Sequence, residues 1–179
     1  ILCWSRSLHA AHRAKPGLFP VASSPLLVGE RLIVNLGARA VGAGVVALDK
    51  RTGRTLWTAT HDGPSCATPA AATIHGRASA FVWTAQHLTA LDPQTGRVTW
   101  QIPFSANIPE KIHATSPLVC GDLVLVSGYH LGCLCVRVLP DGRYEQLWRG
   151  GKEYLDSHYN NLVCANGYVY GFGTVRGGL

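Results

Sequence analysis

The sequence predicts an all-β protein built from repeated four-stranded antiparallel sheets. Twenty Gly and ten Pro favour many short strands joined by turns over long helices. A motif recurs at a fixed spacing, and a second marker precedes each copy at a nearly constant distance. Regular recurrence of this kind is typical of proteins in which one supersecondary unit is repeated.

The motif occupies residues 47–57 and recurs at residues 90–100, a period of 43 residues, with the shared pattern Ala-x-Asp-x-x-Thr-Gly-x-x-x-Trp. In a third unit the pattern is degenerate, because six steps instead of four separate Gly142 from the tryptophan. The second marker is a proline that lies 32, 31 and 31 residues before a tryptophan, in the pairs Pro25 and Trp57, Pro69 and Trp100, and Pro117 and Trp148.

Each unit contains four short apolar runs separated by turn residues; in the first unit, strands are expected at residues 25–28, 32–36, 45–48 and 55–58. Four-stranded antiparallel blades that repeat about every 40 to 50 residues are typical of β-propellers. We therefore expect complete blades at residues 20–60, 64–104 and 112–149, the last strand of a preceding blade within residues 1–9, and the start of a further blade at residues 157–179.

The residues shared by the two copies of the motif each have a role that their chemistry indicates. Asp49 and Asp92 precede tight turns, where a short carboxylate accepts hydrogen bonds from N–H groups two or three residues later. Gly53 and Gly96 supply the positive φ that such turns require. The tryptophans carry the largest apolar surface into the seam between blades, each contributing a few kcal/mol of burial. The predicted docking residues are Trp57, Trp100 and Trp148.

The motif resembles the tryptophan-docking motif of PQQ-like (quinoprotein alcohol dehydrogenase-like) propellers, a family that includes quinoprotein dehydrogenases and the propeller lipoprotein of outer-membrane protein assembly. Two copies match at each defining position, and the similarity runs from Trp4 into the open fourth unit. The resemblance implies an eight-bladed ring, of which this chain makes an open arc of about half. It also implies an extracytoplasmic location, in the periplasm or envelope of a bacterium, and contact with the remaining blades of the same propeller.

Two functions are compatible with the resemblance. The leading hypothesis is a non-catalytic scaffold that offers a propeller rim to a protein or small-molecule partner. The alternative is a fragment of a PQQ-dependent dehydrogenase whose PQQ and calcium ligands lie in other blades. Such enzymes, by resemblance, have two adjacent cysteines beside the quinone, and the sequence contains no Cys-Cys pair. We therefore predict neither a catalytic residue nor a metal site in this segment.

The six cysteines are expected to be buried free thiols, which behave as small apolar side chains. Cys133 and Cys135 share one face of a predicted strand, but about 7 Å separates alternate residues, which is at the limit for a disulfide. Cys120 and Cys164 are expected to occupy equivalent positions at the end of the first strand of successive units. Each is therefore expected to fill a recurring position in its own strand.

The acidic residues do not suggest a catalytic pair. Four of the ten belong to predicted turns. The other six, which include Asp62 and Asp156, lie in loop-like surroundings without a recognisable catalytic spacing, and we expect them to be solvated.

Loops that lead into the first strand of a blade lie on one rim of a propeller, and a rigid scaffold positions them for binding. Loops before the third and fourth units, and a later loop of the third unit, carry polar and aromatic side chains. Their functional interpretation is a patch that binds a ligand or peptide; the alternative is that nearby backbone satisfies them. The candidate rim residues are His113, Tyr129, His130, His158, Tyr159 and Asn160.

The distribution of charge and the hydropathy of the sequence argue against two classes of partner, nucleic acids and membranes that the chain would span. The net charge is +6, but the basic residues are spread along the chain and not gathered as phosphate binding requires, so we expect no nucleic acid partner. The sequence has no run of eighteen apolar residues, so we expect no transmembrane segment. It starts at Ile1 and contains no Met, so any signal peptide is expected upstream of this segment or not at all.

Overall fold

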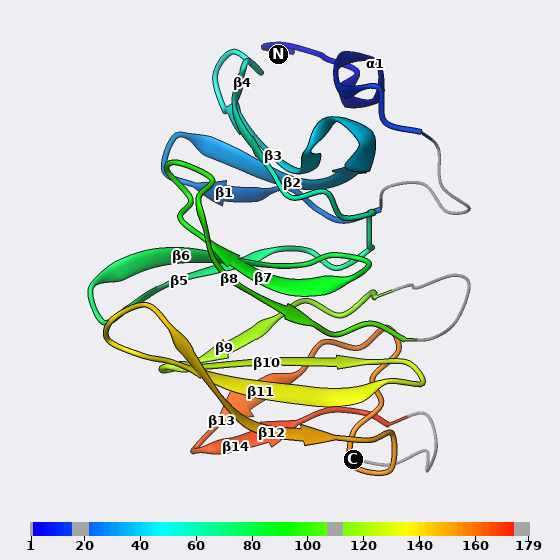
Figure 1. Cartoon of the computed structure of the whole chain (residues 1–179), viewed down its shortest axis with the longest axis vertical. Helices are drawn as coiled ribbons and strands as arrows, with labels where there is room; N and C mark the ends of the chain where they lie inside the picture. The colour runs from blue at the N-terminus through cyan, green and yellow to red at the C-terminus, as the bar shows by residue number, and fades with distance from the viewer. Residues whose placement is uncertain (1, 16–21, 107–112, 174–179) are drawn as a thin grey trace.

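The computed structural model describes residues 2–15, 22–106 and 113–173 of the chain. These residues form three four-stranded antiparallel sheets, followed by a two-stranded hairpin that begins a fourth unit. The sheets are stacked in chain order, from the N-terminal end at the top of Figure 1 to the C-terminal end at the bottom. The prediction of an all-β chain of four-stranded antiparallel blades is confirmed.

Strands that follow one another in sequence are neighbours in every sheet, so each blade is a simple meander. The first blade contains β1 (Leu26–Val28), β2 (Arg31–Ala38), β3 (Ala43–Asp49) and β4 (Thr55–Ala59). The second contains β5 (Ala70–Ile74), β6 (Arg77–Trp83), β7 (His87–Leu91) and β8 (Val98–Pro103). The third contains β9 (Leu118–Cys120), β10 (Leu123–Gly128), β11 (Gly132–Val138) and β12 (Tyr144–Gly150), and the hairpin contains β13 (Val163–Ala165) and β14 (Tyr168–Tyr170).

The hydrophobic core lies between the blades. The middle strands are the most buried, and because side chains alternate across a strand, each sheet sends apolar residues to both of its neighbours. One cluster joins the second blade to the third, with Phe81, Trp83 and Leu134 fully buried in it. A smaller cluster joins the first blade to the second through Ile33 and Val82. The seams between blades therefore contain most of the apolar burial that stabilises the stack.

The aspartate of each intact motif organises the turn after the third strand. Asp49 Oδ1 accepts hydrogen bonds from the backbone N–H groups of Arg51 and Thr52, both at 2.9 Å. Asp92 Oδ1 does the same with Gln94 and Thr95, at 2.7 and 3.2 Å. Hydrogen bonds from the Thr52 side chain and backbone lower the pKa of Asp49. The predicted role of the aspartates is therefore confirmed.

Each of the first two tryptophans docks on the turn of the following blade. Trp4 Nε1 donates to the carbonyl oxygen of Lys50 at 2.9 Å, and Trp57 Nε1 donates to that of Pro93 at 3.1 Å. These acceptors are the residues that directly follow the two turn aspartates. The indole rings also cover the turn glycines so closely that a Cβ added at Gly96 would lie 2.6 Å from Trp57 Cδ2.

A bulge at the same place in each blade orients the tryptophan. The register between the third and fourth strands shifts after Ala47, after Ala90 and after Cys135, which pair with Trp57, Trp100 and Trp148 respectively. Bulges locally increase strand twist and redirect a side chain. Trp148 therefore has the same backbone position as the other two, although its side chain remains 43% exposed beside the fourth unit.

The expectation that residues 1–9 contain the last strand of a preceding blade stays a prediction, because no described strand lies beside them to pair with. Residues 2–6 have no regular secondary structure, and a short helix, α1 (Leu8–His12), follows them. Ser7 caps α1 by accepting a hydrogen bond from the Ala10 N–H. The side chains of Trp4 and Leu8 nevertheless pack against the first blade. Side-chain docking therefore holds this segment without strand pairing.

The expectation that all six cysteines are free was wrong, because Cys120 and Cys164 form a disulfide. The strand registers explain the error. Cys120 pairs with Leu123 at the end of its hairpin, and the equivalent position in the fourth unit is Ala165, which pairs with Tyr168. Cys164 therefore lies one residue earlier, and a shift of one residue turns a side chain to the other face of its strand. The two sulfurs meet in the seam.

The other four cysteines are free. Cys133 and Cys135 are buried thiols, as predicted, and burial raises the pKa of Cys135 to about 11. Cys66 is partly exposed and Cys3 is exposed, so the prediction of burial fails for these two.

Among the described residues, no helix has the length and apolar character required to cross a membrane.

Substitution of the turn glycines should separate the cost of indole packing from the cost of backbone strain. Gly96 and Gly76 have nearly the same φ, +74° and +75°, but only Gly96 is covered by an indole. Gly76→Ala should destabilise the protein by about 1 kcal/mol through backbone strain, and Gly96→Ala by roughly 2 kcal/mol more because Trp57 must move. Urea unfolding measures both. Equal losses would show that the indole does not press on the turn.

The disulfide predicts a defined thiol count and a defined loss of stability. Alkylation of the denatured, unreduced chain should modify four cysteines, and all six after reduction, as counted by mass spectrometry. The bond closes a loop with a sequence separation of 44 residues, so loss of it through Cys120→Ser should reduce the free energy of unfolding by up to about 4 kcal/mol. Cys66→Ser serves as the control. Six modified cysteines before reduction would contradict the bond.

Candidate functional site

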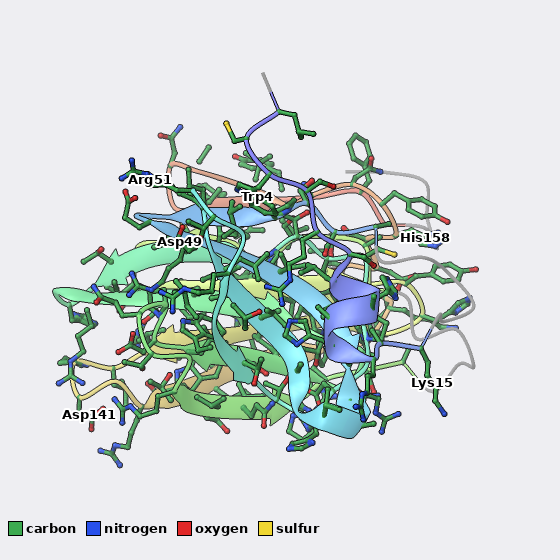
Figure 2. All side chains as sticks on the ribbon, turned by 90° about the horizontal axis from the view of Figure 1, so that it is seen from above. Trp4, Lys15, Asp49, Arg51, Asp141 and His158 are labelled. Carbon is green, nitrogen blue, oxygen red and sulfur yellow. A yellow bond between two sulfur atoms is a disulfide. The ribbon has the colours of Figure 1, made fainter. Side chains whose placement is uncertain are left out.

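The stack presents two rims. One, the loop rim, carries the connections within β2–β3, β6–β7 and β10–β11 together with the segments that link successive sheets; the other, the turn rim, carries the remaining hairpin turns. Figure 1 shows the β10–β11 connection on the right and the β11–β12 turn on the left. In the perpendicular view of Figure 2, His158 lies on the side opposite Asp49 and Asp141. The candidate site is on the loop rim.

Four of the predicted rim residues form a continuous chain of ring contacts, which we call the rim cluster: Tyr129, His130, His158 and Tyr159. The rings of Tyr129 and His158 are stacked, with centroids 4.1 Å apart and planes 12° apart. Tyr159 stacks on His158 at 3.7 Å, and His130 meets Tyr129 edge to face at 4.0 Å. Tyr159 is 69% exposed, so the stack presents an aromatic surface to solvent.

Buried hydrogen bonds hold the two segments that carry the cluster. Ser127, at the end of β10, lies directly before Gly128 and Tyr129, and its hydroxyl accepts the backbone N–H of Ser157 at 3.0 Å. The Ser157 hydroxyl in turn donates to the carbonyl oxygen of Phe172 at 3.0 Å. Ser127 and Ser157 have no exposed surface. The rings therefore stand on a fixed base, which reduces the entropy lost when a partner binds.

The charge of the cluster depends on His158. Partial burial and the neighbouring His130 lower the pKa of His158, and Asp156 opposes them. The ring is therefore largely neutral at pH 7 and stacks on the tyrosines as an uncharged aromatic. Such a surface can pack against an aromatic or proline side chain while the Tyr hydroxyl and His nitrogen atoms at its edge form hydrogen bonds.

The remaining two candidates lie apart from the stack. His113 is buried, with 1% of its surface exposed, and stacks on Trp83 at a centroid distance of 4.1 Å. It belongs to the packed interior and does not reach the rim surface. Asn160 is exposed and directly follows Tyr159 in sequence, but its amide side chain has no ring with which to extend the cluster.

A carboxylate–histidine pair on the same rim was not predicted. Asp62 Oδ2 lies 2.8 Å from His87 Nδ1 and 2.7 Å from Thr84 Oγ1, and Gln101 donates to it at 3.3 Å. Asp62 and Asp156 are buried, so the expectation that they are solvated loop carboxylates was wrong. The network ties the segment after β4 to the second blade. The three partners of Asp62 lie 22, 25 and 39 residues after it in the sequence, and only packing brings them together.

The described part of the chain contains no group of three or more His, Cys, Asp or Glu side chains placed to hold a metal ion. Its free cysteines include no adjacent pair. We therefore assign no reaction step to these residues.

Comparison with known proteins identifies relatives of the chain. A family model described as outer membrane protein assembly factor BamB matches residues 2–174. The crystal structure of BamB from Moraxella catarrhalis is similar in fold, with a TM-score of 0.60 and 19% sequence identity over 84% of this chain. The match covers 45% of that BamB chain, so this chain spans about half the length of its structural neighbour. A search of curated proteins finds no match.

The electrostatics of the cluster can be tested by titration. The pKa of His158 should lie below the ordinary value of 6.5, and His130→Gln should raise it because a neighbouring positive charge is removed. Since the folded-state pKa is the lower one, protonation of His158 opposes folding: the loss of stability is absent well above pH 6.5, grows as the pH falls from about 6.5 to the folded pKa, and is complete below it. NMR titration of the ring carbons measures both values. His9→Gln, in α1, is the control, and an unchanged His158 pKa in His130→Gln would refute the coupling.

Proposed function

The chain belongs to the BamB family of PQQ-like propellers, and from this premise we propose that it is a non-catalytic scaffold that binds protein partners through the rim cluster. The observation that carries the proposal is the cluster of four contacting rings on a rigid base, three of them stacked, with Tyr159 69% exposed at its end. Exposed aromatic side chains on a fixed support are typical anchors of protein interfaces, because they bury a large area at little entropic cost.

We further propose that the partner belongs to the machinery that assembles outer membrane proteins, as the name of the matching family suggests. The Cys120–Cys164 disulfide supports a location in an oxidising compartment such as the periplasm. In this environment the rim cluster would meet segments of envelope proteins. An extended segment with aromatic or proline side chains has the chemistry that the stacked rings accept.

Further blades of the same propeller are the proposed neighbours of the fourth unit. Its outward side chains are large and apolar: Tyr168, Tyr170 and Phe172 are 68%, 49% and 51% exposed. An apolar sheet face of this kind normally packs against another layer. The proposal agrees with the coverage of about half of the neighbouring BamB chain.

Site-specific photo-crosslinking tests the proposed interface. A benzophenone amino acid at position 159 should give an adduct with an outer membrane assembly component when cells are irradiated. The same amino acid at position 51, an exposed residue of the turn rim, is the matched control and should give none. His158→Ala should reduce the adduct severalfold, since it removes the ring on which residue 159 stacks. Equal adducts at the two positions, or none at position 159 with normal protein levels, would rule out the rim cluster as the interface.

A further inference from the structure

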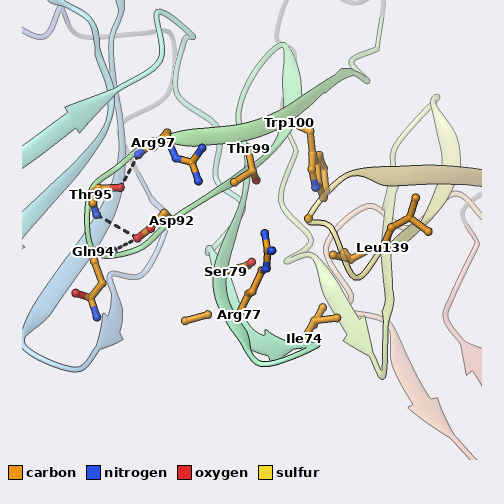
Figure 3. Close-up of a pocket in the computed structure, with 13 residues that line it drawn as sticks. Ile74, Arg77, Ser79, Asp92, Gln94, Thr95, Arg97, Thr99, Trp100 and Leu139 are labelled. Carbon is orange, nitrogen blue, oxygen red and sulfur yellow. Dashed lines mark hydrogen bonds between the residues drawn. The ribbon is translucent and has the colours of Figure 1, made fainter.

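The seam between the second and third blades differs from the first two seams on the turn rim. A pocket of about 380 Å³ opens there, between the β5–β6 and β7–β8 turns of the second blade and the β11–β12 turn of the third (Figure 3). Trp100 forms part of its wall. The pocket lies on the rim opposite the rim cluster, so it cannot be part of the proposed protein interface.

The degenerate third motif explains why the pocket exists. Its turn is a tight hairpin, in which Leu139 N–H bonds to the carbonyl of Arg143 and Gly142 N–H bonds to the carbonyl of Leu139, both at 2.8 Å. A Cβ added at Gly142 would meet only Arg77 Nη1, at 3.1 Å, and no indole. Trp100 packs instead against Tyr144, with centroids 5.2 Å apart. The space that a docked turn fills in the other seams is therefore left open.

The indole N–H of Trp100 has lost the acceptor that its counterparts use. Trp4 and Trp57 each donate to a backbone carbonyl of the following blade. Trp100 makes no such hydrogen bond with any residue that the structure describes, and 7% of its surface remains exposed. Figure 3 shows this nitrogen on the side of the indole that faces the pocket. An acceptor atom of a ligand can take the position of the missing carbonyl.

Two guanidinium groups line the same pocket. Arg77 Nη1 donates to the backbone carbonyl of Asp141 at 3.1 Å, and the Asp141 carboxylate is itself paired with Arg143 at 2.6 Å. Neither Arg77 nor Arg97 forms an ion pair within the described ranges. The wall contains one carboxylate, Asp92, whose Oδ1 already accepts two backbone N–H groups. The charged groups of the lining therefore sum to +1, which one negative charge would neutralise.

We propose that this pocket binds a carboxylate attached to an aromatic or branched apolar group, carried by a small organic acid or by the C-terminal residue of a peptide. The carboxylate would accept hydrogen bonds from Arg97, Arg77 and the Trp100 indole, a set of donors that suits its planar shape. The apolar group would pack against Ile74, Leu139 and the face of Trp100. A phosphate dianion fits less well, because Asp92 repels its second charge.

NMR titration of the full-length, ¹⁵N-labelled protein tests the proposal. The indole signal of Trp100 is assigned by its absence in Trp100→Phe. It should move saturably with 3-phenylpropionate, and 3-phenylpropanamide should bind at least tenfold more weakly, because a charged hydrogen bond is worth about that factor. Gly-Gly-Phe with a free or amidated C-terminus compares the two sources, and the tighter of peptide and free acid identifies the class. Equal affinity of acid and amide, or tighter binding of inorganic phosphate, would overturn the assignment.

Substitutions locate the site. Arg97→Gln should weaken 3-phenylpropionate binding by about tenfold or more. Arg54 occupies the equivalent turn position in the first blade but does not line the pocket, so Arg54→Gln should leave binding unchanged. Arg77→Gln should act like Arg97→Gln if its thermal unfolding matches the parent; otherwise Arg97→Gln alone decides. Equal affinities in Arg97→Gln and Arg54→Gln would refute the site. Crosslinking at position 159 is independent of this result, so either proposal can fail alone.

Discussion

An indole N–H that crosses the seam to a backbone carbonyl of the next blade determines where that blade lies. The acceptors, Lys50 and Pro93, directly follow the aspartates that organise the turns, so the turn must form before the carbonyl has its position. The ring then covers a glycine that has no side chain to displace it. Turn, hydrogen bond and apolar contact therefore depend on one another, and the sequence must supply Asp, Gly and Trp together. This coupling is why the motif recurs as a block.

The third seam shows which parts of this arrangement are separable. The bulge beside Cys135 places Trp148 as in the other blades, so strand pairing alone determines the direction of the tryptophan. What the tight, degenerate turn loses is the carbonyl acceptor for Trp100 and the contact between the turn glycine and that indole. The seam nevertheless remains closed in its interior, because Phe81, Trp83 and Leu134 are fully buried there. Apolar packing holds the blades together, whereas indole docking seals the seam at the turn rim. A defect in docking can therefore open a pocket without opening the core.

The sequence predicted those features in which the interacting residues lie close along the chain or recur in phase. The turn that Asp49 organises ends only four residues later. The loops that carry Tyr129 and His158 could be placed on one rim from the repeat alone. Prediction from the sequence failed where a shift of one residue in strand register, or a contact between residues distant in sequence, decides the structure. Cys164 was aligned with Cys120, although it lies one position earlier and so turns toward it. Asp62 meets His87 only after two blades pack, and His113 is buried by Trp83, which no local pattern reveals.

The separation of the two rims follows from the geometry of the blade. β10 has six residues and spans about 20 Å. The loop rim, which carries the rim cluster, and the turn rim therefore lie at opposite ends of the strands, about this distance apart. A buried side chain between them is packed by neighbours on both faces and moves little. Coupling between the rims would require an element with two arrangements. The hydrogen bond between Ser127 and Ser157 and the Cys120–Cys164 disulfide both reduce the freedom of the seam between the third blade and the fourth unit. A rigid stack of this kind can therefore present two surfaces of different chemistry, one of contacting aromatic rings and the other with a pocket lined by two arginines.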